Sequence, residues 1–322
     1  MLCQKTLAMS NRCLYCYGKL NDGEDFHESC SKKFFGVTVP PKLPYSLNQM
    51  DELAKNVVEH SVSIPGVQAK LSMSLVNESR KKNNDRLTVV GALGGNYIFE
   101  PPSQQFVEMP QNEHLTMRIA EAYGLNVVPS SLIRLKSGEL SYICKRIDRT
   151  EKGEKIHMLD MFQITEAFDK YKSSMEKVGK ALHTYSENTL LDKVTFFELS
   201  VFCYLMGNND MHLKNFSMIK SATGWVLASA YDLLNVSIIL PEDTEELALT
   251  LEGKKKKLKK DHFINLAKGL GLTNKQIDGV FNRMKKNKPL AEEWVRKSFL
   301  SEEMKLAYTE VMFARYQQLK LI

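Results

Sequence analysis

The sequence predicts an α+β protein with two lobes: a small β-rich N-terminal lobe and a larger, mainly α-helical C-terminal lobe. The glycine-punctuated apolar stretches LSMSLV, RLTVVGAL and NYIF have the composition of strands, whereas helical periodicity dominates beyond about residue 159. With 322 residues, 43% of them hydrophobic, the chain is long enough for about two cores. We expect a leader at 1–38, a β-rich nucleotide-binding lobe at 39–147 and a helical catalytic lobe at 148–322.

Three elements between these regions can be predicted individually. The segment NEHLTMRIAEAYGL at 112–125 begins with Asn112 as a helix cap and ends near Gly124, so it predicts a helix. Residues 131–147 predict a hairpin with its turn at Ser137 and Gly138, and a second hairpin is expected around residues 221–224.

Charge and hydropathy exclude some classes of function. The formal net charge of +6 is modest, and much of it lies in the run KKKKLKK at 254–260, so a general nucleic-acid binder is not indicated. That run is either a solvated face or a contact surface for an acidic partner. No stretch reaches the roughly 18 apolar residues of a membrane span, and the N-terminus lacks a long apolar stretch. We expect a cytoplasmic protein without a membrane partner.

Four residues near the N-terminus have the spacing of zinc ligands. Cys13, Cys16, His27 and Cys30 form the pattern C-x2-C-x10-H-x2-C, with turn-forming residues between the two pairs. Tetrahedral zinc takes two ligands from each of two tight turns, and cysteines in a reducing compartment are read first as metal ligands. The alternative is a set of small buried residues and one surface histidine, with no metal bound.

The segment GNNDMHLKNFSMIKSATGWVLASAYD at 207–232 has the spacing of phosphoryl-transfer machinery. Such transfer needs an acid that orients the attacking hydroxyl and oxygen ligands for magnesium. Protein kinases supply an Asp, an Asn five residues later, and an Asp after a hairpin; here these are Asp210, Asn215 and Asp232. The alternative is that the polar residues are turn formers at a helix end. His212, taken alone, is more typical of a structural hydrogen bond.

A glycine turn in SVSIPGVQAKL is a second candidate for contact with phosphate. Gly66 lets the backbone approach a phosphate closely, and Lys70 adds positive charge. The motif is neither a Walker A loop nor the kinase GxGxxG, so spacing alone favours a plain tight turn.

Taken together, GNNDMHLKNFSM, AYDLLNV, SVSIPGVQAKL and NEHLTMRIAEAYGLNVV resemble the HipA-like serine/threonine kinases, the toxin kinases of bacterial toxin–antitoxin modules. The resemblance runs from about residue 60 to the C-terminus and is closest to the short HipT form. It implies a two-lobed kinase-like fold, ATP and Mg²⁺ as cofactors, and an aminoacyl-tRNA synthetase as substrate. It also implies a HipB-like helix-turn-helix antitoxin, DNA bound only through that antitoxin, and a small HipS-like protein replacing a missing N-terminal subdomain.

The resemblance assigns roles residue by residue. It makes Asp210 the catalytic acid, places His212 near the phosphates, and makes Asn215 and Asp232 the magnesium ligands, in agreement with their spacing. The positions that match its ATP-binding residues are Ser63, Gly66, Gln68, Lys70, Lys145, Ile147 and Asp148. Ser63 also matches the autophosphorylated serine of the nucleotide loop, with Ser61 a distant second because Pro65 replaces the usual second serine. A phosphate there adds negative charge and opposes ATP binding.

One position departs from the family. Glu100 stands where the family commonly has a phosphate-contacting lysine, and Glu113 matches that lysine's acidic partner. Lys70 or another basic residue supplies the missing charge, or Glu100 helps to bind a metal, or the protein has lost most of its activity. We expect an active kinase. The alternative is a degenerate pseudokinase or a nucleotide- or antitoxin-binding scaffold, and a zinc-dependent nucleic-acid binder is disfavoured by the modest charge.

Overall fold

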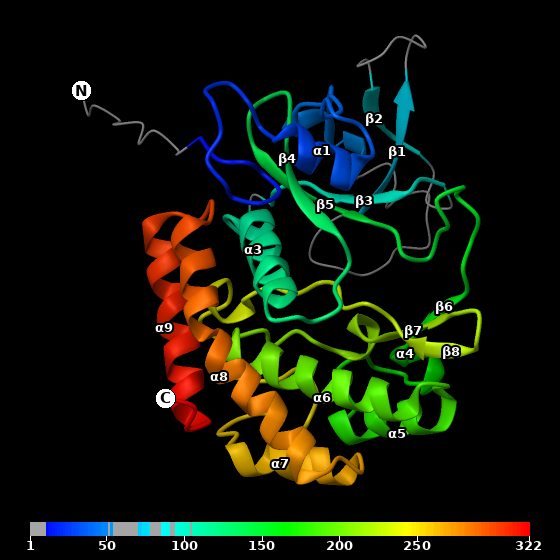
Figure 1. Cartoon of the computed structure of the whole chain (residues 1–322), viewed down its shortest axis with the longest axis vertical. Coiled ribbons are helices and arrows are strands. Elements are labelled where there is room, and N and C mark those ends of the chain that lie inside the picture. Colours follow the sequence, from blue (N-terminus) through cyan, green and yellow to red (C-terminus); the bar gives the residue numbers. More distant parts are fainter. Residues whose placement is uncertain (1–10, 51, 54–69, 78–84, 91–93, 104) are drawn as a thin grey trace. The chain divides into compact units, whose positions relative to one another are not determined.

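The computed structural model describes residues 11–50, 52–53, 70–77, 85–90, 94–103 and 105–322 (Figure 1). Contacts divide the chain into two units. The first comprises Met1–Ser103, Pro129–Lys145 and Lys297–Phe299, and the second comprises Gln104–Val128, Arg146–Arg296 and Leu300–Ile322. Residues 112–125 thus cluster with the second unit, although the boundaries drawn from the sequence place them in the N-terminal lobe.

The first unit is built on an antiparallel sheet of strand order β2-β1-β3-β5-β4. Its strands are β1 (Leu71–Asn77), β2 (Asp85–Val89), β3 (Tyr97–Glu100), β4 (Ser130–Arg134) and β5 (Leu140–Lys145). The predicted hairpin is confirmed as β4 and β5, and Gly138 in its turn has φ +107°, a conformation that glycine adopts readily. β5 is buried along nearly all of its length, whereas β2 at the edge is mostly half-exposed.

Helix α1 (Glu28–Phe35) belongs to the same unit and packs on the sheet through two aromatic side chains. The ring centroids of Phe34 and Phe35 lie 5.9 and 6.1 Å from that of Tyr97 on β3. The helix ends at Gly36, which has the left-handed φ of +83° typical of a helix C-terminus.

The second unit combines helices with a small antiparallel sheet of order β6-β7-β8. Its strands are β6 (Met158–Asp160), β7 (Ser217–Lys220) and β8 (Trp225–Leu227), so the second predicted hairpin is confirmed. Its helices are α3 (Met109–Ala122), α4 (Met161–Ile164), α5 (Met175–Tyr185), α6 (Thr189–Leu205), α7 (Lys260–Gly269), α8 (Asn274–Lys297) and α9 (Glu302–Gln318), with 3-10 turns η1 (Leu213–Asn215) and η2 (Val236–Ile238).

Helix α6 forms the centre of this unit. It is apolar on most of its surface and packs against α5, α7 and α9 (Figure 1). Phe196, Phe197 and Phe202 on this helix are completely buried. Because burial of large aromatic side chains contributes strongly to stability, α6 is a rigid base for the loop that follows it.

Helix α3 begins earlier than the sequence predicts. The assignment of Asn112 as its cap is wrong, because the helix starts at Met109 and Asn112 lies inside its first turn. Its buried amide bonds to the backbone of Asn235 instead: Nδ2 donates to the carbonyl oxygen at 2.9 Å, and Oδ1 accepts from the amide nitrogen at 2.8 Å. Asn112 therefore ties α3 to the segment that follows residue 232.

The basic run at 254–260 is partly engaged within its own unit. Leu258 is fully buried, Lys255 forms an ion pair with Glu245 at 3.1 Å, and Lys260 lies 4.7 Å above the ring of Phe281. These contacts agree with a structural role for much of the run. Among the helices of the described ranges, none combines the length and apolar character that crossing a membrane requires.

Candidate active site

Buried amides hold the loop that follows α6. Asn208 and Asn209 are only 1% and 5% exposed. Oδ1 of Asn208 accepts from the backbone nitrogen of Asp210 at 3.2 Å, and Nδ2 of Asn209 donates to Oδ2 of Asp243 and to the carbonyl oxygen of Glu245, both at 3.0 Å. Ordinary turn formers face solvent, whereas these two asparagines fix the position of Asp210.

The predicted pair Asp210 and Asn215 lies on one tight loop. The side chain of Asn215 is 6% exposed, and its Nδ2 donates to the backbone carbonyl oxygen of Asp210 at 3.0 Å. The backbone nitrogen of His212 donates to the same oxygen at 2.8 Å. Because its nitrogen is used in this way, Asn215 presents its amide oxygen, which is the atom that magnesium binds.

A tyrosine orients the carboxylate of Asp210. The hydroxyl of Tyr171 donates to Oδ1 of Asp210 at 2.8 Å. Burial, and then the negative charge of Asp210, raise the pKa of Tyr171, so the phenol stays protonated and remains a donor. This hydrogen bond fixes the orientation of the Asp210 carboxylate, a group that can accept a proton or a hydrogen bond.

His212 is buried, neutral and paired with a lysine. Its Nε2 accepts a hydrogen bond from Nζ of Lys170 at 2.9 Å. Burial and the charge of Lys170 lower the pKa of His212 to about 4. The proton of the neutral ring therefore sits on Nδ1, which is buried and has no hydrogen-bond partner within the described residues. A buried N–H donor of this kind suits an anionic ligand such as a phosphate.

Asp232 follows the β7–β8 hairpin in a left-handed backbone conformation. Its φ is +59°, which is uncommon for a residue other than glycine. The preceding Tyr231 is anchored, since its hydroxyl donates to the carbonyl oxygen of Lys214 at 2.8 Å. A carboxylate oxygen of Asp232 lies within 4.8 Å of one from Glu113, which is buried on α3. Two carboxylates this close repel each other and so favour a bound cation.

In the first unit, the departure at Glu100 is compensated locally. Glu100 is 3% exposed, and its Oε1 lies 3.2 Å from Nζ of Lys70. Lys70 thus offsets the charge of the carboxylate at the position where we expect a lysine from the resemblance. Lys145, at the end of β5, has its Nζ 5.9 Å from the ring centroid of Phe34.

The stretch at 145–148, where we expect the adenine to bind, ends at Asp148, which two arginines hold in place. Arg146 and Arg149 both form ion pairs with Asp148, at 2.8 and 2.5 Å. Burial alone would raise the pKa of Asp148, but the two guanidinium groups outweigh it and the pKa is lowered. The carbonyl oxygen of Asp148 accepts from the nitrogen of Ile156 at 2.9 Å. Ile147 is half-buried between these polar neighbours.

The predicted nucleotide loop lies outside the described residues. This applies to Ser61, Ser63, Pro65, Gly66 and Gln68. Their assignments to ATP binding and autophosphorylation therefore stay predictions.

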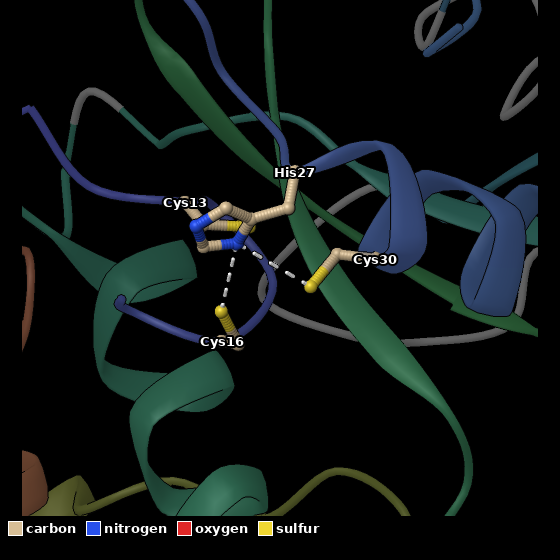
Figure 2. A group of neighbouring side chains, drawn as sticks. All are labelled: Cys13, Cys16, His27 and Cys30. Atoms are coloured by element: carbon tan, nitrogen blue, oxygen red, sulfur yellow. Dashed lines mark hydrogen bonds between the residues drawn. The ribbon is translucent and has the colours of Figure 1, made fainter. Parts of the chain in front are cut away.

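The predicted zinc ligands converge in the first unit (Figure 2). Nδ1 of His27 lies 3.4 Å from Sγ of Cys16 and 3.7 Å from Sγ of Cys30, and Sγ of Cys13 lies within 4.8 Å of the other ligand atoms. On the other side of the ring, Nε2 of His27 hydrogen-bonds to the carbonyl oxygen of Lys19 at 2.9 Å.

The chain matches a known protein family over most of its length. The sequence model of the HipA-like C-terminal domain matches residues 62–292. This chain belongs to the HipA-like C-terminal domain family. The match contains Asp210, Asn215 and Asp232 but begins after the cysteine and histidine cluster.

Three curated proteins are similar in sequence to this HipA-like chain. One named "Putative kinase Y4dM" from Sinorhizobium fredii is 32% identical over 71% of this chain, and one named "Putative kinase" from Haemophilus influenzae is 28% identical over 66%. The serine/threonine-protein kinase toxin HipA of Shewanella oneidensis is 25% identical over 59%. The chain spans 61%, 63% and 47% of the lengths of these three relatives.

Two solved structures share the fold of this HipA-like chain. HipA in the Shewanella oneidensis complex of HipA, HipB and operator DNA matches with a TM-score of 0.67 at 20% identity, covering 86% of this chain and 72% of that one. The Helicobacter pylori proinflammatory kinase CtkA matches with a TM-score of 0.51 at 15% identity, covering 69% and 87%. The predicted α+β, HipA-like fold is confirmed.

Sequence reasoning missed Tyr171 and Lys170. They precede their partners by 39 and 42 residues and lie in the polar segment DKYKSS, which carries no catalytic pattern. Only the folded structure brings them beside Asp210 and His212.

Proposed function

We propose that this protein is an ATP-dependent serine/threonine kinase that acts as the toxin of a toxin–antitoxin module, in the short HipT-like form. Its family and the kinase names of its relatives support the reaction class. The observation that carries the proposal is the arrangement of Asp210, Asn215 and Asp232, which combines an oriented acid with two oxygen ligands in one unit.

Asp210 acts on the hydroxyl of the substrate. Tyr171 fixes the orientation of the Asp210 carboxylate, which would accept the hydroxyl proton as the substrate oxygen attacks the γ-phosphorus and ADP leaves. Asn215 and Asp232 would hold Mg²⁺, with Glu113 adding negative charge beside Asp232. When bound, ATP would supply the phosphoryl group and Mg²⁺ would neutralise part of the charge of its phosphates. His212 donates from Nδ1 to a phosphate oxygen, held in position by Lys170.

Further residues proposed for nucleotide binding lie in the first unit and in the stretch at 145–148. Lys145 would contribute positive charge, as would Lys70 to the degree that its pairing with Glu100 leaves, and the backbone at Ile147 and Asp148 would meet the adenine. In the nucleotide loop, Gly66 and Gln68 contact phosphate. Ser63, in the same loop, is the autophosphorylation site, and its phosphate opposes rebinding of ATP because like charges repel.

The partners of the proposed toxin are a HipB-like helix-turn-helix antitoxin and a small HipS-like protein in place of the missing N-terminal subdomain. DNA is bound only through the antitoxin, and an aminoacyl-tRNA synthetase is the substrate. The Shewanella oneidensis complex, which contains HipA, HipB and operator DNA, supports an antitoxin of this kind.

Phosphoproteomics of expressing cells tests the proposal. Cells that express the wild-type protein should contain phosphorylated serines and threonines, Ser63 among them, that are absent when Asp210→Asn is expressed at the same level. Asp278→Asn, which makes the same chemical change on the exposed face of α8, is the matched control and should reproduce the wild-type map. Identical maps for wild type and Asp210→Asn would refute a kinase.

A second candidate is a non-catalytic nucleotide- or antitoxin-binding scaffold. The Lys70–Glu100 pair favours it, because a lysine already paired with a buried carboxylate has less charge to offer to ATP. A scaffold gives the same phosphoproteome with or without Asp210, so the comparison above separates the two.

A further inference from the structure

We infer that Cys13, Cys16, His27 and Cys30 form a structural zinc centre that fastens the N-terminal segment 13–35 to the sheet of the first unit. The cluster lies outside residues 62–292, the part of the chain that the family model matches. The proposal therefore does not depend on kinase activity.

The ligand atoms are spaced for one tetrahedral ion. With zinc–sulfur and zinc–nitrogen bonds of about 2.3 and 2.0 Å, tetrahedral geometry places sulfur and nitrogen ligands roughly 3.5 Å apart. The distances from Nδ1 of His27 to the sulfurs of Cys16 and Cys30 are 3.4 and 3.7 Å. All four ligand atoms lie within 4.8 Å of one another (Figure 2). Three thiolates and one imidazole form a ligand set typical of structural zinc.

The surroundings of the cluster prepare the histidine for metal binding. Nε2 of His27 donates to the carbonyl oxygen of Lys19 at 2.9 Å, which leaves the lone pair of Nδ1 directed toward the sulfurs. Metal-bound histidines commonly donate a hydrogen bond from the ring nitrogen that does not bind the metal. Here that bond places the proton on Nε2, so the lone pair of Nδ1 can bind the ion. A Cβ atom at Gly18 would lie 3.1 Å from Cε1 of His27 and 3.3 Å from Sγ of Cys16, so a side chain there would crowd the cluster.

Residues between the ligands attach the cluster to the sheet. The carbonyl oxygen of Leu14 accepts from the nitrogen of Leu132 on β4 at 3.3 Å. Asp25 accepts from Nε and Nη2 of Arg134, also on β4, at 3.0 and 2.9 Å. A segment this short cannot bury a core of its own, so an ion that fixes its loops also fixes these contacts.

The aromatic residues of the segment point to a structural role rather than to nucleic-acid binding. Tyr15, Tyr17, Phe26, Phe34 and Phe35 are all at most 6% exposed. Proteins that bind single strands use exposed aromatic rings on which bases stack. Here the rings are buried, with Tyr17 packed at 5.0 Å against Phe299 of the same unit.

Metal analysis of the full-length chain tests the site. Protein purified without chelator and without a histidine tag should contain about one zinc ion per chain. Cys16→Ser and Cys30→Ser should lower the zinc content at least about tenfold, because each removes one of the four ligands. Cys203→Ala removes a buried thiol on α6 in the second unit and should leave the zinc content unchanged. Less than about 0.2 zinc per chain in folded, reduced wild type, or a disulfide within the cluster, would overturn the site.

A measurement on the wild-type protein tests the fastening role without any substitution of the ligands. A mercurial reagent should release the zinc, and a colorimetric indicator measures its release. Loss of zinc should lower Tm by about 5 °C or more and speed amide exchange in β3 and β4, and Zn²⁺ added after removal of the reagent should reverse both effects. If zinc is released while Tm and amide exchange stay unchanged, the ion does not fasten the segment to the sheet.

Discussion

Glu100 is the residue that most affects the proposed nucleotide binding. Its carboxylate is buried, and its pairing with Lys70 offsets a positive charge that would otherwise attract nucleotide phosphates. A lysine at this position, which the resemblance leads us to expect, would add positive charge instead. The residue at position 100 therefore sets how much positive charge the first unit offers to nucleotide phosphates.

Replacing Glu100 with glutamine should tighten binding of Mg²⁺–ATP. Glu100→Gln keeps the shape of the side chain but removes one negative charge beside Lys70, so Kd should fall about fivefold, equivalent to about 1 kcal/mol. Calorimetry measures the change, and Glu24→Gln at an exposed position serves as the control. Weaker binding would contradict charge compensation and assign Glu100 to a metal.

His212 should make stability depend on pH in a defined window. Its pKa is about 4 in the folded protein, against an ordinary value of 6.5. Between these values the unfolded chain binds a proton that the folded chain does not, so the free energy of unfolding falls as pH drops from 6.5 toward 4. His212→Gln should reduce that slope by up to about 1.4 kcal/mol per pH unit.

Urea unfolding at several pH values measures this slope. His183→Gln is the matched control, since His183 also contacts a lysine, Lys193, at 3.0 Å but lies at an exposed position. Equal slopes for wild type and His212→Gln would show that His212 is not a buried neutral group.

At the scale of elements, the turn between α6 and the loop of Asp210 depends on Gly207. Its φ is +70°, and a Cβ atom there would lie 2.6 Å from Oδ1 of Asn235 and 2.7 Å from Cγ1 of Val311. The backbone at Gly207 therefore passes close to Asn235 and Val311, where α6 leads into the loop of Asp210.

Gly207→Ala should destabilise the protein by about 3 kcal/mol, because strain at positive φ adds to overpacking. Gly253→Ala separates the two effects: its φ is +74°, but no atom lies within 4 Å of the added Cβ, so about 1 kcal/mol is expected. Chemical denaturation measures both values. Equal decreases in the free energy of unfolding for the two variants would show that crowding against Asn235 and Val311 adds no destabilisation.

Local patterns in the sequence predicted some elements better than others. The hairpins at 131–147 and 217–228 were predictable because period-two apolar residues and turn residues lie close together. The start of α3 was not, because Asn112 looks like a cap locally but forms its hydrogen bonds with Asn235, 123 residues away. Hydrogen bonds between residues so far apart in the sequence leave no pattern in the residues around Asn112.

Sequence patterns also predicted only part of the candidate site. The spacing of Asp210, Asn215 and Asp232 along the chain was enough to nominate them, whereas Tyr171 and the Lys70–Glu100 pair depend on the fold. Long-range side-chain pairs follow from how the elements pack, which neither propensity nor periodicity encodes.

On the scale of the whole molecule, the two units carry different parts of the proposed machinery. The first holds Lys70, Glu100 and the cysteine and histidine cluster, and the second holds Asp210, Asn215 and Asp232. The family match covers the residues proposed for phosphoryl transfer, while the cluster stands outside it. Metal content and kinase activity can therefore be tested separately.

Incubation of the purified protein with Mg²⁺ and γ-labelled ATP tests whether the protein is an active kinase. Wild type should incorporate label on serine, Asp210→Asn should incorporate none, and Asp278→Asn should match wild type. If wild type incorporates no label and Glu100→Lys does, the natural protein is a degenerate kinase and not an active one.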